Sequence, residues 1–217
     1  MSDMKSDASV TVIGDLVGSR RSADRAAVHA RFARAVADVN AEFAPLVPLR
    51  IGVGDEFQGI FASLGSAIAA TLRLRLALLP EVDVRQGIGW GQVQVLAEEP
   101  RVEDGPGWWA ARSAIEAVEG YERKAALRAV RTAYVAADDE PGPDAATINA
   151  ALMTRDQVVS GLSERSLSVL GGLLGGRQQQ EVADELGISP SAVSQRIRAD
   201  GLGVLLAADE LLRGGVA

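Results

Sequence analysis

Three carboxylates near the start of the chain stand beside glycines. Asp15 follows the β-branched run of residues 9–13. Asp55 and Glu56 directly follow Gly54. Carboxylate oxygens are preferred ligands of Mg²⁺ and other hard cations, and glycine lets a backbone approach a phosphate closely. We therefore predict a Mg²⁺ or Mn²⁺ ion at Asp15, Asp55 and Glu56. A nucleotide or polyphosphate would be contacted by Gly18, Ser19 and Gly54.

The hydrophobic pattern around these carboxylates predicts an α+β domain of the ferredoxin-like βαββαβ type over residues 1–140. In such a sheet the first strand lies beside the hairpin formed by residues 49–61. Asp15 and Asp55 would then lie about 4–6 Å apart and repel each other unless a cation joins them. The alternative is that these acids only form turns. The expected strands are residues 9–13, 49–53, 57–61, 82–88, 91–96 and 131–135, and the expected helices are 25–42, 64–79 and 107–131.

The remainder of the chain predicts an all-helical second domain over residues 145–217. Residues 138–144 are acidic and rich in proline and glycine, which is typical of a linker. Beyond them every segment has a helical pattern. The expected helices are residues 145–161, 163–174, 178–186, 189–199 and 202–212.

Residues 178–199 predict a helix-turn-helix. Gly187 lies where the turn needs a positive φ, and Ser189 and Pro190 are suited to start the next helix. Val193 and Ile197, four residues apart, would bury one face of that helix. The other face carries short polar and arginine side chains that suit the major groove of DNA. The predicted DNA contacts are Ser191, Gln195, Arg196 and Arg198.

The charge balance limits how such a module could bind DNA. The 217 residues carry a net charge of −7, and from residue 161 onward five arginines stand against seven acids. Because phosphate contacts dominate DNA affinity, one copy would bind weakly and with a strong salt dependence. A homodimer would double the contacts. Its interface could be supplied by Leu202, Leu205, Leu206, Leu211 and Leu212.

The composition also excludes several classes of site. Cysteine is absent and His29 is the single histidine, so thiol nucleophiles, disulfides and Cys or multi-His metal sites are excluded. The start of the chain has no apolar leader, and the apolar residues 64–79 contain two arginines and are too short to span a bilayer. We therefore expect a cytoplasmic protein without a membrane partner.

Four segments resemble, in order, the class III nucleotidyl cyclases, and the hairpin also resembles that of the GGDEF diguanylate cyclases. They are residues 15–19, 53–57, 85–93 and 109–112. The resemblance implies a palm-type fold with Asp15 and Asp55 as the two-metal ligands. It also makes Arg112 a candidate phosphate clamp; the alternative is that Arg112 is an exposed helix arginine.

The chain departs from these enzymes at three positions. Ile51 stands where cyclases carry a purine-selecting lysine, and Trp108 stands where they carry an asparagine. Val53 replaces a glycine of the GGDEF signature. The residues implied for metal and phosphate are present, while those for base selection and the transition state are not. This favours nucleotide binding over cyclisation.

The whole chain is similar to the SatD family of small bacterial proteins. The similarity is carried by residues 12–20, 54–61 and 104–112 together with the helical tail. The tail itself resembles the helix-turn-helix of sigma-factor region four and of LuxR-type regulators. The preferred interpretation is a regulator in which a metal- and nucleotide-binding palm is coupled to a DNA-binding module. The alternatives are a two-metal, cyclase-like nucleotide enzyme with an accessory module, and an interaction adaptor with both sites degenerate.

Overall fold

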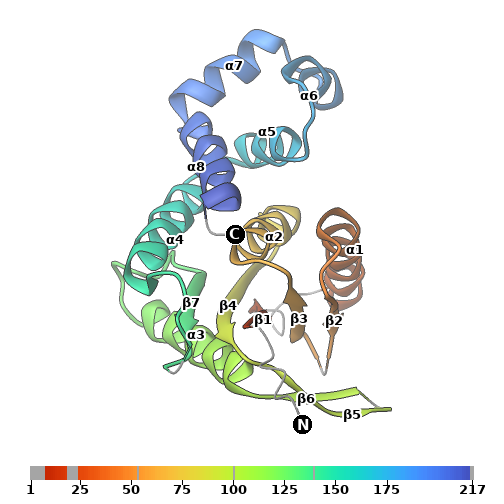
Figure 1. Ribbon diagram of the computed structural model, residues 1–217. Coiled ribbons are helices and arrows are strands. Elements are labelled where there is room, and N and C mark those ends of the chain that lie inside the picture. Colours follow the sequence, from red (N-terminus) through yellow and green to blue (C-terminus); the bar gives the residue numbers. More distant parts are fainter. Residues whose placement is uncertain (1–7, 19–23, 53, 100, 139, 216–217) are drawn as a thin grey trace.

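The computed structural model describes residues 8–18, 24–52, 54–99, 101–138 and 140–215 (Figure 1). It confirms the predicted mixture of α and β structure. The elements in chain order are β1 (Ser9–Val17), α1 (Arg25–Phe43), β2 (Val47–Ile51), β3 (Phe57–Phe61), α2 (Leu64–Leu78), β4 (Asp83–Gly91), β5 (Gln94–Glu98), β6 (Arg101–Asp104), α3 (Pro106–Glu122), β7 (Thr132–Ala136), α4 (Ala145–Ser160), α5 (Glu164–Leu174), α6 (Gln179–Leu186), α7 (Pro190–Ala199) and α8 (Leu202–Gly215).

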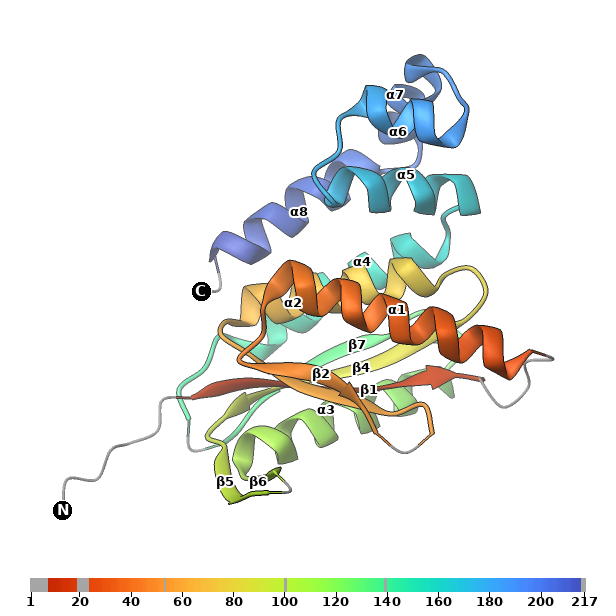
Figure 2. The same ribbon diagram turned by 90° about the vertical axis from the view of Figure 1, so that its right-hand side faces the viewer.

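Five strands form one sheet in the order β2-β3-β1-β4-β7. β1 is central and runs antiparallel to both β3 and β4, and β7 runs parallel to β4. α1, α2 and α4 lie on one face and α3 lies on the other, while α5 to α8 form a further layer beyond α2 (Figure 2). As predicted, the first strand lies beside the hairpin strand β3.

β4 is longer than predicted and passes straight through the Gly-Trp pair at 89–90. Its glycines at 87, 89 and 91 alternate, so all three face α3. A Cβ at Gly89 would lie 2.2 Å from the carbonyl oxygen of Gly107, and one at Gly87 would lie 2.3 Å from that of Ala111. These glycines therefore allow α3 to pack closely on one continuous strand, where we expected two strands on either side of residues 89–90. The segment predicted as a strand at 91–96 instead leads into β5, which pairs with β6 in a separate two-stranded arm.

α2 is buried on both sides, which explains its apolar sequence. Leu74 and Leu78 pack in the core shared with the sheet and α1, and Leu72 and Leu76 pack in the core of α5 to α8. Within the described ranges no helix is long and apolar enough to cross a membrane. The apolar character of α2 therefore reflects a position between two protein layers.

On each outer strand of the sheet, an asparagine from a neighbouring helix bonds to the backbone of one residue. On β2, Asn40 of α1 donates to the carbonyl of Leu49 at 3.0 Å and accepts from its N–H at 2.8 Å. On β7, Asn149 of α4 makes the same pair of bonds with Tyr134, at 2.8 and 2.9 Å. Free strand edges invite pairing with another chain. Each clamp satisfies the outward backbone groups of one edge residue within the chain.

α4, which we predicted to begin the second domain, packs into the sheet. Ile148 and Leu152 are buried in the core that the sheet shares with α1 and α2. Asp156, with no exposed surface, accepts hydrogen bonds from the backbone N–H groups of Arg131 and Thr132 at 2.8 and 2.7 Å. Its other oxygen lies 3.2 Å from both Arg75 and Arg155. One carboxylate thus joins α2, α4 and the start of β7.

We expect Asp156→Ala to lower the free energy of unfolding by about 3–5 kcal/mol, because it removes an acceptor that two buried arginines and two backbone N–H groups share. Chemical denaturation followed by circular dichroism measures this. Asp38→Ala, on the exposed surface of α1, should change the free energy of unfolding by only about 0.5 kcal/mol. Equal effects of the two substitutions on the free energy of unfolding would mean that the buried contacts of Asp156 do not stabilise the fold.

Candidate functional site

Asp15 and Arg85 form the centre of the candidate site. They face each other across the β1–β4 pair, on the side of the sheet covered by α3. The Nε and Nη2 atoms of Arg85 lie 2.9 and 2.8 Å from one carboxylate oxygen of Asp15. The Nη1 atom of the same guanidinium lies 3.2 Å from Glu122 and 3.5 Å from Glu119, both on α3. Arg85 therefore bridges the sheet and the end of α3.

Asp55 acts electrostatically on this group from the β2–β3 turn. Burial raises the pKa of Asp15 above its usual value, and the charges of Asp55 and Glu119 add to this effect, although Arg85 opposes it. Asp15 and Asp55 are therefore near enough for the charge of Asp55 to act on Asp15. Glu56, the third predicted ligand, is exposed beside Asp55.

Two of the predicted phosphate contacts, Gly18 and Gly54, lie at the end of the sheet where β1 ends and β3 begins. Gly18 at the end of β1 and Gly54 in the hairpin turn both adopt a positive φ, of 73° and 79°. A Cβ at Gly54 would meet nothing within 4 Å, so its backbone is open to a ligand. Ser19 lies outside the described residues. Arg112 is exposed on α3 and, within the part of the chain that the structure describes, forms no hydrogen bond or ion pair.

The donor set suits a cation that arrives with a phosphate. Among the described residues no group of three or more His, Cys, Asp or Glu side chains could hold a metal. Mg²⁺ is commonly held by one or two carboxylates together with waters and substrate phosphates. Asp15 and Asp55 can provide that number of carboxylates. One oxygen of Asp15 is already engaged by Arg85, so a cation and Arg85 would compete for it.

Arg85, Glu119 and Glu122 were not identified from the sequence as members of this site. Arg85 was noted only as part of a strand that resembles cyclases. The signal that could have found it is the strand register, which sets residue 85 opposite residue 15. Glu119 and Glu122 lie in the last turns of α3, and their role follows only from where that helix crosses the sheet.

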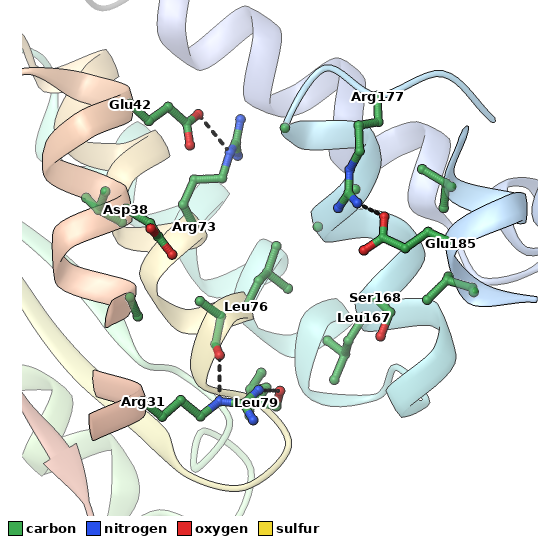
Figure 3. A pocket seen from close by; sticks show the side chains of 18 residues that line it. Arg31, Asp38, Glu42, Arg73, Leu76, Leu79, Leu167, Ser168, Arg177 and Glu185 are labelled. Atoms are coloured by element: carbon green, nitrogen blue, oxygen red, sulfur yellow. Dashed lines mark hydrogen bonds and ion pairs between the residues drawn. The ribbon is translucent and has the colours of Figure 1, made fainter. Parts of the chain in front are cut away.

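A cavity of about 530 Å³ between α1–α2 and α5–α6 is a poorer place for a phosphate (Figure 3). Each of its arginines already has a carboxylate partner. Arg31 pairs with Glu81, Arg73 with Glu42 and Asp209, and Arg177 with Glu185. An anion entering here would meet as many acids as bases.

In the helical layer, α6 and α7 are joined by a short turn. Gly187 adopts a positive φ of 62°, and the Ser189 hydroxyl caps α7 by accepting from the N–H of Ala192 at 3.2 Å. Val193 is fully buried as predicted, whereas Ile197 is only partly buried. On α7, three of the four predicted DNA contacts are exposed. They are Ser191, Gln195 and Arg198.

The side chain of Arg196, the fourth predicted DNA contact, points toward α5 of the same helical layer. Its Nη1 atom lies 3.0 Å from the hydroxyl of Ser166 and 3.4 Å from that of Ser163, at the start of α5. Its guanidinium also lies 3.7 Å from Asp200. These contacts fasten α7 to α5. A contact between Arg196 and DNA stays a prediction, and it would have to draw this side chain away from α5.

The leucines that we expected to form a dimer face are divided between two environments. Leu202 and Leu205 are buried within the core of α5 to α8, and Leu206 packs against it. Leu212 packs against the core of the sheet, while Leu211 is 74% exposed. The proposed dimer therefore cannot use all five leucines. The homodimer itself stays a prediction.

We expect Asp15→Asn to raise the melting temperature at pH 7. The pKa of Asp15 is raised in the folded state, so its contribution to stability is complete below the ordinary value of 3.8 and is lost as the pH rises through the raised pKa. The asparagine stays neutral, and its oxygen can still accept from Arg85. Thermal melts from pH 3 to pH 8 should show that the melting temperature of the variant exceeds that of the parent by an amount that grows with pH. A variant less stable than the parent at pH 7 would mean that the Arg85 pair outweighs burial.

The chain was compared with protein families, curated proteins and solved structures. No curated protein matches it. Two solved structures of a bacterial light-regulated adenylyl cyclase are similar at 13% and 12% identity, with TM-scores of 0.46 and 0.45. Each similarity covers 59% of this chain, and they cover 75% and 43% of the respective cyclase chains. The model of the SatD family matches residues 9–212. The chain therefore belongs to the SatD family.

Proposed function

We propose that this SatD protein is a cytoplasmic regulator in which the Asp15–Asp55 site binds a nucleotide or polyphosphate with Mg²⁺, and in which α6 and α7 bind DNA. The observation that carries the ligand site is the position of the partly buried Asp15, opposite Arg85 and at the end of β1 that lies beside the β2–β3 turn with Asp55. A desolvated carboxylate beside other acids is a common feature of functional sites. A cation would relieve this repulsion.

The strand order supports the finer proposal of a ferredoxin-like palm. The first four strands of the sheet follow the order β2-β3-β1-β4 with antiparallel neighbours. This arrangement sets the end of β1 beside the β2–β3 turn. The two acids that we propose as cation ligands, Asp15 and Asp55, come from these two places.

Binding is better supported than cyclisation. Trp108 is buried in the core between α3 and the sheet, and Ile51 packs against the core on the opposite face. Neither side chain can replace the polar residues that cyclases carry at the positions implied by the resemblance. We therefore propose a ligand-binding role for the site, with turnover as the competing hypothesis.

The proposed DNA-binding surface is the exposed side of α7. Its contacts within the chain are with α5, α6 and α8, and Figure 1 shows it at the far end of the molecule from the sheet. Gln195 could read adenine, and Arg198 could contact guanine or phosphate. In the proposed dimer, two such helices would lie about 34 Å apart along one side of the duplex.

We expect ATP or GTP to raise the melting temperature only when Mg²⁺ is present. A ligand at a hundred times its dissociation constant adds about 2.7 kcal/mol of stability. Asp55→Asn should remove this shift and leave the unliganded fold intact, because Asp55 lies in a turn. Analysis of the same mixtures should show little or no cyclic product. Cyclic or linear dinucleotide products would support the enzyme hypothesis instead, and no shift with any nucleotide would favour the adaptor.

For DNA, we expect Gln195→Ala and Arg198→Ala to weaken binding to a duplex selected from a random-sequence library. Loss of a bidentate base contact costs about 1–3 kcal/mol of binding free energy. Loss of a phosphate contact lowers by about one the slope of the logarithm of the binding constant against the logarithm of the salt concentration. Gel shifts at several salt concentrations measure both effects. Arg165→Ala removes an exposed arginine from α5 and serves as the control. Equal binding by all variants would exclude α7 as the recognition helix.

A further inference from the structure

The cavity between α1–α2 and α5–α6 has the size and position of a small-molecule site (Figure 3). Its volume of about 530 Å³ lies within the range of ligand pockets, which often occur where two packed units of a protein meet. Apolar side chains from α2, α5 and α6 line it. They are Leu76, Leu167, Val182 and Leu186. A ligand that fills this space would therefore have an apolar body.

Gly171 lies in the wall of this cavity, and packing does not explain why it lacks a side chain. It is inside α5, and a Cβ there would meet nothing within 4 Å beyond its own helix. Glycine inside a helix is destabilising relative to alanine. The neighbouring Gly172 differs, because a Cβ there would lie 2.8 Å from Val182. Gly171 therefore keeps space open on the side of α5 that lines the cavity.

The charged groups around the cavity leave an excess of negative charge. Its three arginines are each already paired with one carboxylate, from Glu81, Asp209 and Glu185. Two further carboxylates, Asp38 and Glu42, also line the cavity. Charge complementarity therefore favours a cation here over an anion or a neutral molecule.

Asp38 and Glu42 project from α1 on one side of the cavity (Figure 3). They are four residues apart on the helix, so their like charges are neighbours and repel each other. Within the part of the chain that the structure describes, Asp38 forms no hydrogen bond or ion pair. Glu42 lies 3.3 Å from the buried Nε of Arg73, but that nitrogen forms no hydrogen bond. Both carboxylates can therefore accept hydrogen bonds from a ligand.

An organic cation fits these groups better than a metal ion. Among the described residues no group of three or more His, Cys, Asp or Glu side chains could hold a metal. An ammonium group has three N–H donors and can bond to two carboxylates at once. The leucine-lined walls would cover a hydrocarbon body attached to it.

We propose that this cavity binds an organic ammonium ion with an apolar body. Asp38 and Glu42 bind the ammonium group. The apolar body lies against Leu76 and Leu167 and in the space beside Gly171. The walls belong to α1 and α2 on one side and to α5 and α6 on the other, so the bound ligand joins the helical layer to the layer that covers the sheet. This site is separate from the Asp15–Asp55 site and needs no metal.

The test compares hexylamine, hexan-1-ol and hexanoate, which share one alkyl chain and differ in charge, by isothermal titration calorimetry at neutral pH. We expect only hexylamine to bind. Asp38→Asn should weaken its binding about tenfold, because a charged acceptor is lost. Glu116→Gln is the matched control, since it removes an exposed carboxylate from α3 on the opposite face of the sheet (Figure 2). Its affinity for hexylamine should equal that of the parent.

Gly171→Leu tests where the apolar body lies. The new side chain would occupy the cavity, so we expect hexylamine binding to be lost. The melting temperature should not fall, because leucine has a higher helix propensity than glycine and the space is open. Gly120→Leu is the control. It adds the same side chain to α3, where a Cβ would have only Arg123 nearby, at 3.9 Å, and it should not change the affinity.

Several outcomes would overturn the proposal. Binding of hexan-1-ol or hexanoate as tight as that of hexylamine would mean that Asp38 and Glu42 do not select a cation. Unchanged hexylamine binding in Gly171→Leu would place the ligand elsewhere, and so would equal binding by Asp38→Asn and Glu116→Gln. The last pair decides alone if Gly171→Leu does not fold. Absence of hexylamine binding to the parent would also overturn the proposal, and it would leave the proposed nucleotide and DNA sites untouched.

Discussion

The buried carboxylate of Asp156 is the contact on which the arrangement of the layers depends. It accepts from the backbone where β7 begins and from arginines of α2 and α4. Burial lowers the pKa of Arg155, and the charge of Asp156 opposes that effect. A charge with no exposure is tolerated in a protein only when its oxygens are bonded in this way. The same contact holds α4 on the sheet and thereby fixes where the later helices begin.

Ion pairs continue from this buried group to the candidate site. Arg75 links Asp156 to Asp83, and Arg131 links Asp83 to Glu122. Burial alone would raise the pKa of Asp83, but Arg75 and Arg131 hold it below its usual value. Glu122 in turn contacts Arg85, the partner of Asp15. The candidate site is therefore the partly exposed end of a charge network whose other end lies in the core.

The helical layer is attached to the sheet mainly through α2. Arg73 of α2 makes two contacts with Asp209 of α8, at 3.4 and 3.1 Å, and donates to the carbonyl of Leu174 at 3.0 Å. Gly65 lies so close to α8 that a Cβ there would be 2.7 Å from a backbone oxygen. These contacts use the inner faces of α5 and α8. On α7, the side chains of Ser191, Gln195 and Arg198 stay exposed.

The sequence alone determined the kind and order of most elements and the positions of several of their ends. Helix periodicity, the cap at Ser189 and the turn at Gly187 depend on residues close together in the chain, so a single sequence contains them. It also predicted that Asp15 and Asp55 lie near each other, because the order of strands and turns limits which ends of a sheet can meet. Family membership was likewise visible in the motifs.

Tertiary structure alone decided how the charges pair. Asp15 and Arg85 are 70 positions apart, and only the β1–β4 register makes them partners. The glycines of β4 fall between two expected strands in the sequence, but α3 packs on them and the strand is continuous. Arg196, a predicted DNA contact, also bonds to Ser166 of α5. Periodicity shows which face of an element is apolar, but not which neighbour covers that face. Pairing and packing depend on register and crossing geometry, which residues distant in the chain establish only when the fold forms.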